Sequence, residues 1–353
     1  MVQAVGLDVI VVTYNSERLL PAFIESVRTA RWPDELTVRI TVVDNHSSDR
    51  TPELAAELAD AVIDTGANLG FGAAVNEGVR RTDAEALLLA NVDVRLLEGG
   101  WSTALKRLRT DADVVAPAVV DAHLANPGPF AHVRAGTLLR THFARKDMRS
   151  ARLDFGADGT LRHASIDGWP CGAAFLIRRE AFEASGGYDP KYFLYMEETD
   201  LFWRLHRAGR RFEWVPEAAV LHVGGGDVRN GDRSLFDRAM TMGKVRFFAK
   251  NRSRRQALVA RAVLGADCVR NGATAWGRSV LAADDAARRT AAGWFTLAGD
   301  IWRYRLDDPT ASPPPRPEPV AELEPAPATV LRELRGDVEA QRPSAGLLAG
   351  RPR

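Results

Sequence analysis

Short runs of β-branched residues alternate with amphipathic segments near the start of the chain, and this alternation constrains the fold more than any other feature. The apolar runs lie at 8–13, 38–43, 62–63 and 86–90, and segments with helical spacing lie at 17–27, 52–58 and 71–80. Strands that alternate with helices form a parallel sheet with helices on both faces. We therefore predict an α/β fold with a Rossmann-like, mostly parallel sheet, in which Asn15 or Ser16 caps the first helix and Ser48 or Asp49 the second.

The rest of the chain divides into three predicted regions. After a less regular stretch, strands are expected at 173–177, 212–215 and 219–222, and helices at 179–184 and 197–208. Residues 234–306 are expected to be largely helical, whereas the prolines between 309 and 327 exclude a helix or central strand there. The predicted organisation is a catalytic domain at 1–228, a basic helical region at 229–308, and a linker and tail at 309–353.

Composition excludes several other classes of protein. Hydrophobic residues make up 46% of the 353 residues and charged residues 26%, which is typical of a globular protein. Two cysteines, Cys171 and Cys268, are too few for a disulfide framework, and no Cys-x-x-Cys pair indicates zinc. Because the N-terminus lacks the pattern of a secretion signal and no run of about 18 apolar residues occurs, we expect a cytoplasmic protein.

Basic residues are concentrated in the predicted helical region. The formal net charge is +1, yet residues 229–278 contain twelve basic side chains and three acidic ones. Arg252, Arg254 and Arg255 precede apolar residues at 258–263, a composition suited to an amphipathic helix on an anionic membrane surface. A helix packed on the catalytic domain, or a contact in an oligomer, would give the same pattern, and we expect no nucleic acid as a partner.

Polar residues follow the predicted strands at their carboxyl ends, where ligands bind to such sheets. They occur at 13–15, 44–49, 68–72 and 91–93. Asp44 and the turn after it can bind a nucleotide at the start of a helix, although for this motif taken alone a helix cap is the more common explanation. Gly70 allows the backbone to approach a ligand closely, and a simple turn is the alternative.

Two groups of acidic residues are candidates for chemistry. Asn91 and Asp93 can point into one cleft, where an acidic oxygen holds Mg²⁺ or Mn²⁺ against a diphosphate. Glu197, Glu198 and Asp200 follow the aromatic run 192–195, which can raise the pKa of a carboxyl group and make it a usable base. His222, ahead of three glycines, can bind the metal or a phosphate.

The ordered series VVTYN, VDNHSSD, NLGFG, NVD, CGAAFLIRREAF, GGYDPKYFLYMEETDLFWRL and LHVGGG resembles the inverting family 2 glycosyltransferases with a GT-A fold. The resemblance covers residues 8–226 and is strongest to the bacterial rhamnosyltransferase-like branch. It implies that the sheet belongs to a GT-A domain followed by a C-terminal helical region.

The resemblance also implies roles for individual residues. Asp44 matches the position that reads the nucleotide base, and Asp93 matches the last acidic position of the metal-binding Asp-x-Asp motif, in which Asn91 replaces the first carboxylate. Glu198 occupies the position of the catalytic base, with Glu197 as the alternative, and Asp200 orients its neighbours. The remaining residues that it places are Thr13, Tyr14, Asn15 and Asn68 with Gly70 on the donor side, His222 near the metal, and Gly172 and Trp169 on the acceptor side.

The activity implied is transfer of a sugar from a nucleotide diphosphate, with dTDP-L-rhamnose as the expected donor. The expected acceptor is a polyprenyl-diphosphate-linked or cell-envelope glycan, reached from the inner face of the plasma membrane. A UDP-hexose or UDP-galactofuranose donor is an alternative, as is a non-catalytic glycan-binding protein, since Asn91 and Glu198 depart from the family pattern. A sugar nucleotidyltransferase is disfavoured because Thr13 to Ser16 stand where that class has a basic Gly-rich loop.

Overall fold

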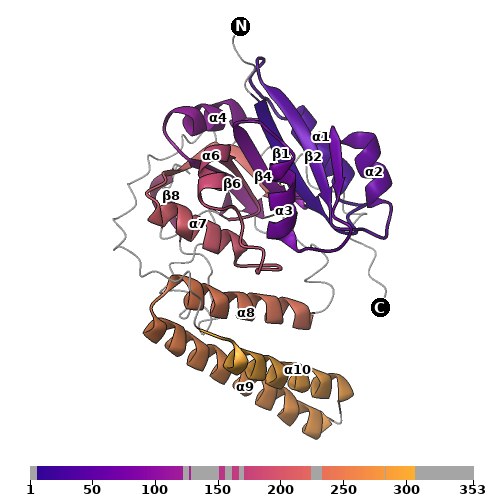
Figure 1. The fold of residues 1–353 in the computed structure, drawn as a ribbon, viewed down its shortest axis with the longest axis vertical. Helices are drawn as coiled ribbons and strands as arrows, with labels where there is room; N and C mark the ends of the chain where they lie inside the picture. Colours follow the sequence, from indigo (N-terminus) through magenta and orange to yellow (C-terminus); the bar gives the residue numbers. More distant parts are fainter. Residues whose placement is uncertain are drawn as a thin grey trace.

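The computed structural model describes residues 6–121, 127–128, 151–155, 161–166, 171–223, 233–282 and 284–306. The first part has the predicted alternation of strands and helices (Figure 1). Its elements are β1 (Gly6–Thr13), α1 (Leu20–Thr29), β2 (Thr37–Asp44), α2 (Thr51–Leu58), β3 (Ala61–Asp64), α3 (Phe71–Arg80) and β4 (Ala86–Asn91). Trp169 and the proline-rich segment from Pro309 lie outside the described residues.

The second part completes the sheet. It contains β5 (Val94–Leu96), α4 (Trp101–Thr110), β6 (Val114–Asp121), β7 (Pro127–Gly128), β8 (Ala151–Phe155), β9 (Leu161–Ile166), β10 (Ala174–Arg178), α6 (Arg179–Ala184), α7 (Glu197–Arg207) and β11 (Phe212–His222). The strand order is β3-β2-β1-β4-β10-β6-β11-β5, with β7 beside β6. β1 to β4, β6 and β11 share one direction, whereas β5, β7 and β10 run antiparallel to their neighbours. The sheet is therefore mostly parallel, as predicted.

Two local predictions were wrong. The two short strands expected at 212–215 and 219–222 form one strand, β11, whose pairing with β6 shifts register between Val215 and Ala219. The sequence suggested a break because Pro216 lacks an N–H group, and the register shift accommodates that residue. The cap expected for the first helix at Asn15 or Ser16 was also misplaced, because α1 begins after Leu19 without a capping side chain. α2 begins after Arg50, and Asp49, one of the two caps expected for it, accepts a hydrogen bond from the Thr51 N–H at 3.0 Å.

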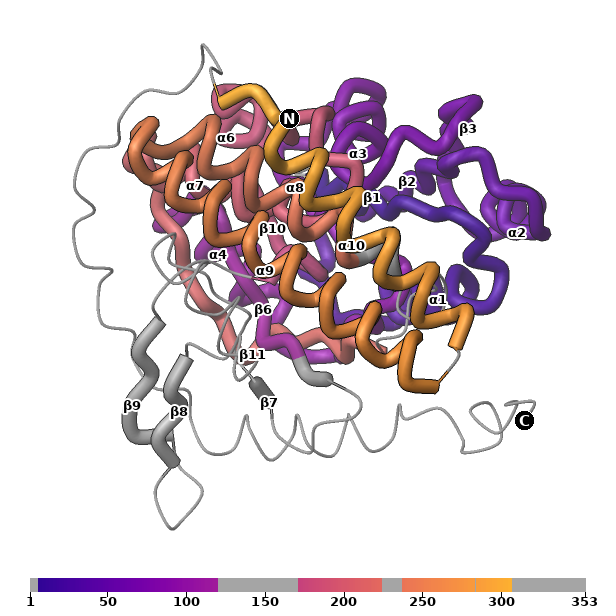
Figure 2. The backbone as a smooth tube through the Cα atoms, turned by 90° about the horizontal axis from the view of Figure 1, so that it is seen from below, coloured from indigo at the N-terminus to yellow at the C-terminus, as the bar shows by residue number. Residues whose placement is uncertain are grey.

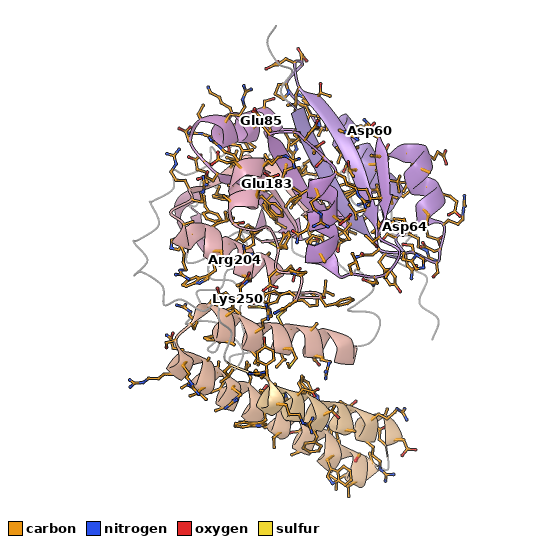
Figure 3. The ribbon with its side chains drawn as sticks, viewed as in Figure 1. Asp60, Asp64, Glu85, Glu183, Arg204 and Lys250 are labelled. Atoms are coloured by element: carbon orange, nitrogen blue, oxygen red, sulfur yellow. The ribbon has the colours of Figure 1, made fainter. Side chains whose placement is uncertain are left out.

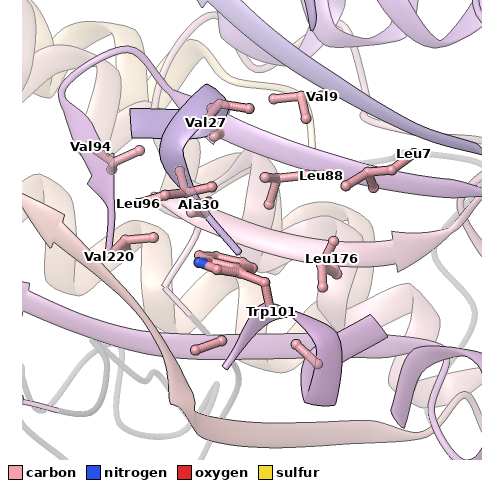
Figure 4. Close-up of a cluster of buried hydrophobic side chains, with 14 of the residues drawn as sticks. Leu7, Val9, Val27, Ala30, Leu88, Val94, Leu96, Trp101, Leu176 and Val220 are labelled. Carbon is pink, nitrogen blue, oxygen red and sulfur yellow. The ribbon is translucent and has the colours of Figure 1, made fainter. Parts of the chain in front are cut away.

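The sheet is buried on both faces because its strands alternate between two cores. Leu7, Val9 and Val11 of β1 pack with α1 and α4 on one face, where the buried Trp101 lies beside Leu176 (Figure 4). Ile10 of β1 and Phe175 of β10 pack with α3, α6 and α7 on the other face. This burial on both faces explains the nearly continuous apolar runs in the sequence.

Three helices follow the sheet domain, as predicted for 234–306. They are α8 (Arg233–Asn251), α9 (Arg254–Ala282) and α10 (Asp285–Arg303). α8 lies between the sheet domain and the α9–α10 hairpin (Figures 1 and 2). Phe247 of α8 and Ala257 of α9 belong to the same core as β10 and α7, so these helices pack on the sheet domain. No helix among the described residues is long and apolar enough to cross a membrane.

The basic region does not present all its charge to solvent. Arg246 and Lys250 bind Asp189 of the sheet domain, at 2.5 and 2.9 Å. The Arg252 guanidinium stacks over the Trp203 ring, 4.2 Å from its centroid. Burial lowers the pKa of Lys244. The expectation that Arg252 belongs to an exposed cluster with Arg254 and Arg255 is therefore corrected: Arg252 packs against α7, while Arg254 and Arg255 are exposed.

Candidate active site

The first half of the site is the loop pair that follows β1 and β2. Thr13 and Asp44 are register partners at the ends of these strands, and the Thr13 hydroxyl donates to Asp44 Oδ1 at 2.8 Å. Ser47 donates to the same carboxylate from its hydroxyl at 2.6 Å and its backbone N–H at 2.8 Å. With only 2% of Asp44 exposed, its carboxylate fixes the two loops to each other and leaves little surface for a ligand.

Asn15 and Tyr14 lie on the same loop pair. Asn15 has a left-handed backbone with φ of 49°, donates its N–H to Ser47 Oγ at 2.8 Å, and accepts from the Ser48 N–H at 2.8 Å through Oδ1. The Asn15 side chain therefore holds the loop in place. Tyr14 is half exposed, so its ring is a surface on which a nucleobase can stack.

The third loop explains why Gly70 is required. Gly70 has φ of +83°, and a Cβ there would lie 2.2 Å from the carbonyl oxygen of Phe193. Its N–H donates to Asn68 Oδ1 at 3.1 Å, and the next N–H, from Phe71, donates to the Phe193 carbonyl at 3.0 Å. Asn45, which the sequence did not single out, donates to the Gly70 carbonyl at 3.2 Å. These contacts join the donor-side loops to the segment that leads into α7.

Asp93 and His222 meet at the end of the sheet. β4 ends at Asn91, β11 ends at His222, and His222 Nε2 lies 3.2 Å from Asp93 Oδ2. The Asp93 carbonyl accepts from the N–H of Val223 at 2.9 Å, which fixes the strand ends together. Burial alone would raise the pKa of the Asp93 carboxyl, but the hydrogen bond and charge of His222 outweigh burial and lower it. Asp93 is therefore held as a carboxylate.

Asp93 and His222 are suitable ligands for a divalent cation that also takes ligands from a substrate. Adjacent ligands of an octahedral cation lie about 3 Å apart, close to the Asp93–His222 separation. Carboxylate suits both Mg²⁺ and Mn²⁺, and imidazole favours the transition metal. The part of the chain that the structure describes contains no group of three His, Cys, Asp or Glu arranged to hold a metal. Water and diphosphate oxygens would have to supply the remaining ligands.

The second half of the site is the start of α7, where the backbone is strained. Tyr195 and Met196 have φ of 66° and 72°, values that cost about 1–3 kcal/mol each for residues with side chains. Gly243 of α8 packs against this turn, because a Cβ there would lie 2.9 Å from Met196 Cγ. Glu197, Glu198 and Asp200 follow in the first turn of the helix, where its dipole favours negative charge.

Glu198 lies against Gly172. A Cβ on Gly172 would be 2.8 Å from Glu198 Cγ, so only glycine leaves room for this side chain. Burial raises the pKa of Glu198, against the hydrogen bonds that its carboxylate accepts from backbone N–H groups and Thr199. A raised pKa brings a carboxyl group closer to the range in which it can accept a proton from a hydroxyl group.

Glu197 is more deeply buried and lacks compensating contacts. It is 6% exposed, and its Oε2 has no hydrogen-bond partner among the described residues. Burial and the charge of Glu198 both raise its pKa well above the ordinary value. The Tyr188 hydroxyl is likewise buried and unpartnered, and the charges of Glu197 and Glu198 contribute to its raised pKa. Sequence reasoning missed Tyr188, because its position depends on a backbone held by Asn76 of α3.

Cys171 connects the two carboxylate groups of the site. Burial raises the pKa of its thiol to about 11, a hydrogen bond with the backbone of Ala173 opposes this, and the charges of Glu198 and Asp93 raise it further. The thiol therefore lies within electrostatic reach of both residues. Geometry agrees, because the Asn91 N–H donates to the Ala173 carbonyl at 2.8 Å and so holds the strand end before Asp93 next to Gly172. The structure thus brings together Asp93, His222, Gly172 and Glu198, which lie far apart along the chain.

Asp200, three residues after Glu197, has a different environment. Its carboxylate is fully buried and accepts from Arg204 Nε at 2.8 Å, Lys250 Nζ at 2.9 Å and Asn251 Nδ2 at 2.7 Å. Arg204 and Lys250 lie on facing sides of α7 and α8 (Figure 3). With these partners Asp200 joins the two helices, which supports an orienting role and not direct proton transfer.

Comparison with known proteins places this arrangement in context. The model of the family described as glycosyl transferase family 2 matches residues 8–186, which include the donor-side loops and Asp93. An N-acetylglucosaminyl-diphospho-decaprenol L-rhamnosyltransferase from Mycobacterium tuberculosis is 32% identical over 238 residues, covering 61% of this chain and 75% of the relative. Rhamnosyltransferase WbbL from Escherichia coli K12 is 23% identical over 238 residues, covering 65% and 87%.

Solved structures support the fold. A crystal structure of GalNAc-T7 with UDP, GalNAc and Mn²⁺ superposes with a TM-score of 0.51 and 14% identity, over 71% of this chain and 49% of that chain. This chain thus spans about half of that protein. At this level of identity the likeness concerns the fold alone.

Proposed function

This chain belongs to glycosyl transferase family 2 and is a glycosyltransferase with a GT-A fold, and we propose that it moves L-rhamnose from dTDP-L-rhamnose to a polyprenyl-diphosphate-linked glycan. The observation that carries the proposal is the adjacent pair of carboxyl groups with raised pKa, Glu197 and Glu198, of which Glu198 packs against Gly172. The strand that leads to Asp93 is hydrogen-bonded next to that glycine, because the Asn91 N–H donates to the Ala173 carbonyl at 2.8 Å. The names of the two rhamnosyltransferase relatives support the choice of sugar and the lipid-linked acceptor.

The proposed base is Glu198. Both glutamates have a raised pKa, but Glu198 is partly exposed and Glu197 is buried, so only Glu198 is accessible to an acceptor hydroxyl. Glu198 would accept the hydroxyl proton as the oxygen attacks the anomeric carbon from the side opposite the diphosphate, which inverts that centre. General-base catalysis of this kind contributes about 10²- to 10⁴-fold.

The donor side is proposed to hold the nucleoside diphosphate. Tyr14 offers an exposed ring for the base, while Thr13 and Asp44 keep the loops in position. Asp93 and His222 would hold Mg²⁺ or Mn²⁺, which supplies positive charge to the departing diphosphate. Asn91, at the end of β4, contributes an amide where a second carboxylate would strengthen that site.

Thermal unfolding with a panel of nucleotide sugars tests the donor. A donor at 100 times its dissociation constant stabilises the fold by about 2.7 kcal/mol. We expect dTDP-L-rhamnose to stabilise the protein more than UDP-hexoses or UDP-galactofuranose, and Mn²⁺ to increase the effect in the wild type but not in Asp93→Ala. The surface variant Asp285→Ala is the matched control, because that carboxylate is exposed on α10.

Transfer to a polyprenyl-diphospho-GlcNAc acceptor, followed by release of dTDP, tests the reaction itself. Turnover with a UDP-sugar and none with dTDP-L-rhamnose would replace the proposed donor. Donor binding without hydrolysis or transfer would instead identify a glycan-binding protein that lacks turnover.

A further inference from the structure

The outer surface of the α9–α10 hairpin has an apolar row with no partner among the described residues. Exposed apolar side chains recur along α9 at helical spacing, and the larger ones remain 41–62% exposed. The row consists of Leu258, Ala262, Val269, Ala273, Trp276 and Val280. Successive members are three, four or seven residues apart, which puts them on one side of the helix.

Two aromatic side chains from α10 extend this surface. The Phe295 ring lies over Gly272 and the Trp302 ring over Gly265, where a Cβ would come within 2.8 and 3.0 Å of them. Gly265 lies one helical turn before Val269, and Gly272 lies one helical turn before Trp276, so both rings border the apolar row. Phe295 and Trp302 are 43% and 53% exposed although they pack on α9.

The two helices that form this surface have more basic than acidic residues. Residues 254–305 contain nine arginines and four aspartates. Arg254 and Arg255 begin α9, Arg289 lies near the opposite end of the hairpin, and none of these three pairs with an acidic side chain in the described ranges. Arg288 lies on the same side of α10 as Phe295 and Trp302, since the three are seven residues apart, and it pairs with the exposed Asp285 at 3.3 Å.

From this combination we infer that the α9–α10 surface binds an anionic phospholipid bilayer, with Trp276, Val280, Phe295 and Trp302 in the interfacial layer. Tryptophan and phenylalanine are suited to that layer, and arginines beside them can reach the lipid phosphates. A second copy of the chain would place the same excess of positive charge against itself, whereas anionic lipid neutralises that charge. The inference goes beyond sugar transfer and does not depend on it.

Co-sedimentation with vesicles that contain no glycan acceptor tests the inference. We expect the full chain to pellet with phosphatidylcholine vesicles containing phosphatidylglycerol, less so at high salt, and weakly with phosphatidylcholine alone. The double variant Trp276→Glu, Val280→Glu should bind at least tenfold more weakly. Val62→Glu, at a 40% exposed position on β3, is the matched control and should bind as the wild type does.

Both variants alter exposed side chains, so both should unfold at the same midpoint as the wild type. Weaker binding by the double variant then cannot be attributed to misfolding. Equal binding by the double variant, equal pelleting with both vesicle types, or no pelleting of the wild type would overturn the inference. Light scattering tests the alternative that the surface binds a second copy of the chain. A dimeric wild type and a monomeric double variant would support that alternative. Failure of sugar transfer would leave the lipid result unaffected.

Discussion

The buried carboxylates in the first turn of α7 have contrasting environments. Asp200, on the side facing α8, accepts hydrogen bonds from Arg204, Lys250 and Asn251. Glu197, buried one turn earlier, has an oxygen with no partner, and Glu198 lies beside it. Removing a buried carboxylate that has cationic partners is costly because the partners are left unpaired, whereas a buried carboxylate without such partners costs stability and has a raised pKa. The difference agrees with the proposed roles, in which Glu198 of the pair acts as the base and Asp200 orients its neighbours.

Replacing the proposed base should have the largest effect. Glu198→Gln keeps the size of the side chain but cannot accept a proton, so kcat should fall by about 10²- to 10⁴-fold with donor affinity unchanged. Glu197→Gln should reduce kcat less. Steady-state kinetics with saturating acceptor and calorimetric donor titration measure the two quantities. Retention of more than about a tenth of the wild-type kcat in Glu198→Gln would remove Glu198 from the role of base.

Removing the compensated carboxylate should instead reduce stability. Asp200→Ala removes the buried carboxylate that Arg204 and Lys250 share and leaves Lys250 with Asp189 as its acidic partner; breaking a buried pair costs about 3–5 kcal/mol. Urea unfolding measures the change. Asp285→Ala, which breaks an exposed pair with Arg288, should cost no more than about 1 kcal/mol. Equal losses in the two variants would mean that the cluster between α7 and α8 is not a major source of stability.

A substitution next to Glu198 should displace its carboxylate without removing it. Gly172→Ala places a methyl group 2.8 Å from Glu198 Cγ, so the carboxylate must shift while remaining ionisable. We expect kcat to fall by about tenfold or more, because misplacement of about 1 Å can cost up to 10²-fold. Gly277→Ala on α9 is the control, since its added Cβ meets nothing within 4 Å. Unchanged kcat in Gly172→Ala would show that the contact does not position Glu198.

The burial of Glu197 should lower the free energy of unfolding at neutral pH. The raised pKa of Glu197 means that its charged form is disfavoured in the folded protein, so wild-type stability decreases as pH rises above the ordinary value of 4.5. Glu197→Gln should therefore be more stable than the wild type at neutral pH, by on the order of 1 kcal/mol. The difference should vanish below about pH 4.5, where both states of the wild type are protonated.

Urea unfolding at several pH values measures this difference, and Glu180→Gln, on the exposed side of α6, should show none. A destabilised Glu197→Gln variant at neutral pH would mean that Glu197 has a compensating partner.

The sequence predicted the sheet and the donor-side loops well because both depend on local patterns. Thr13 and Asp44 end neighbouring parallel strands, so strand prediction alone brings them together. The predicted metal pair, Asp93 and His222, also lies at strand ends, and the structure confirms their proximity but not their role.

Contacts that depend on side-chain packing could not be predicted in the same way. Asp200 is within hydrogen-bond distance of Lys250 and Asn251 only because α8 packs across α7, and no periodicity in the sequence specifies that crossing. The same is true of Tyr188, whose backbone is held by Asn76, more than 100 residues earlier in the chain. Gly172 is the residue from which one such packing contact could have been suspected, because the approach of Glu198 leaves no room for a side chain there.

The pH dependence of kcat in the wild type and in Glu198→Gln tests the central claim most directly. Glu198 must be ionised to accept the acceptor's proton, and its pKa is raised above 4.5. The wild-type kcat should therefore fall as pH decreases through an apparent pKa above that value, and the small residual rate of Glu198→Gln should lack this fall. The same acidic limb in both proteins would contradict the assignment, because the titrating group would then be a residue other than Glu198.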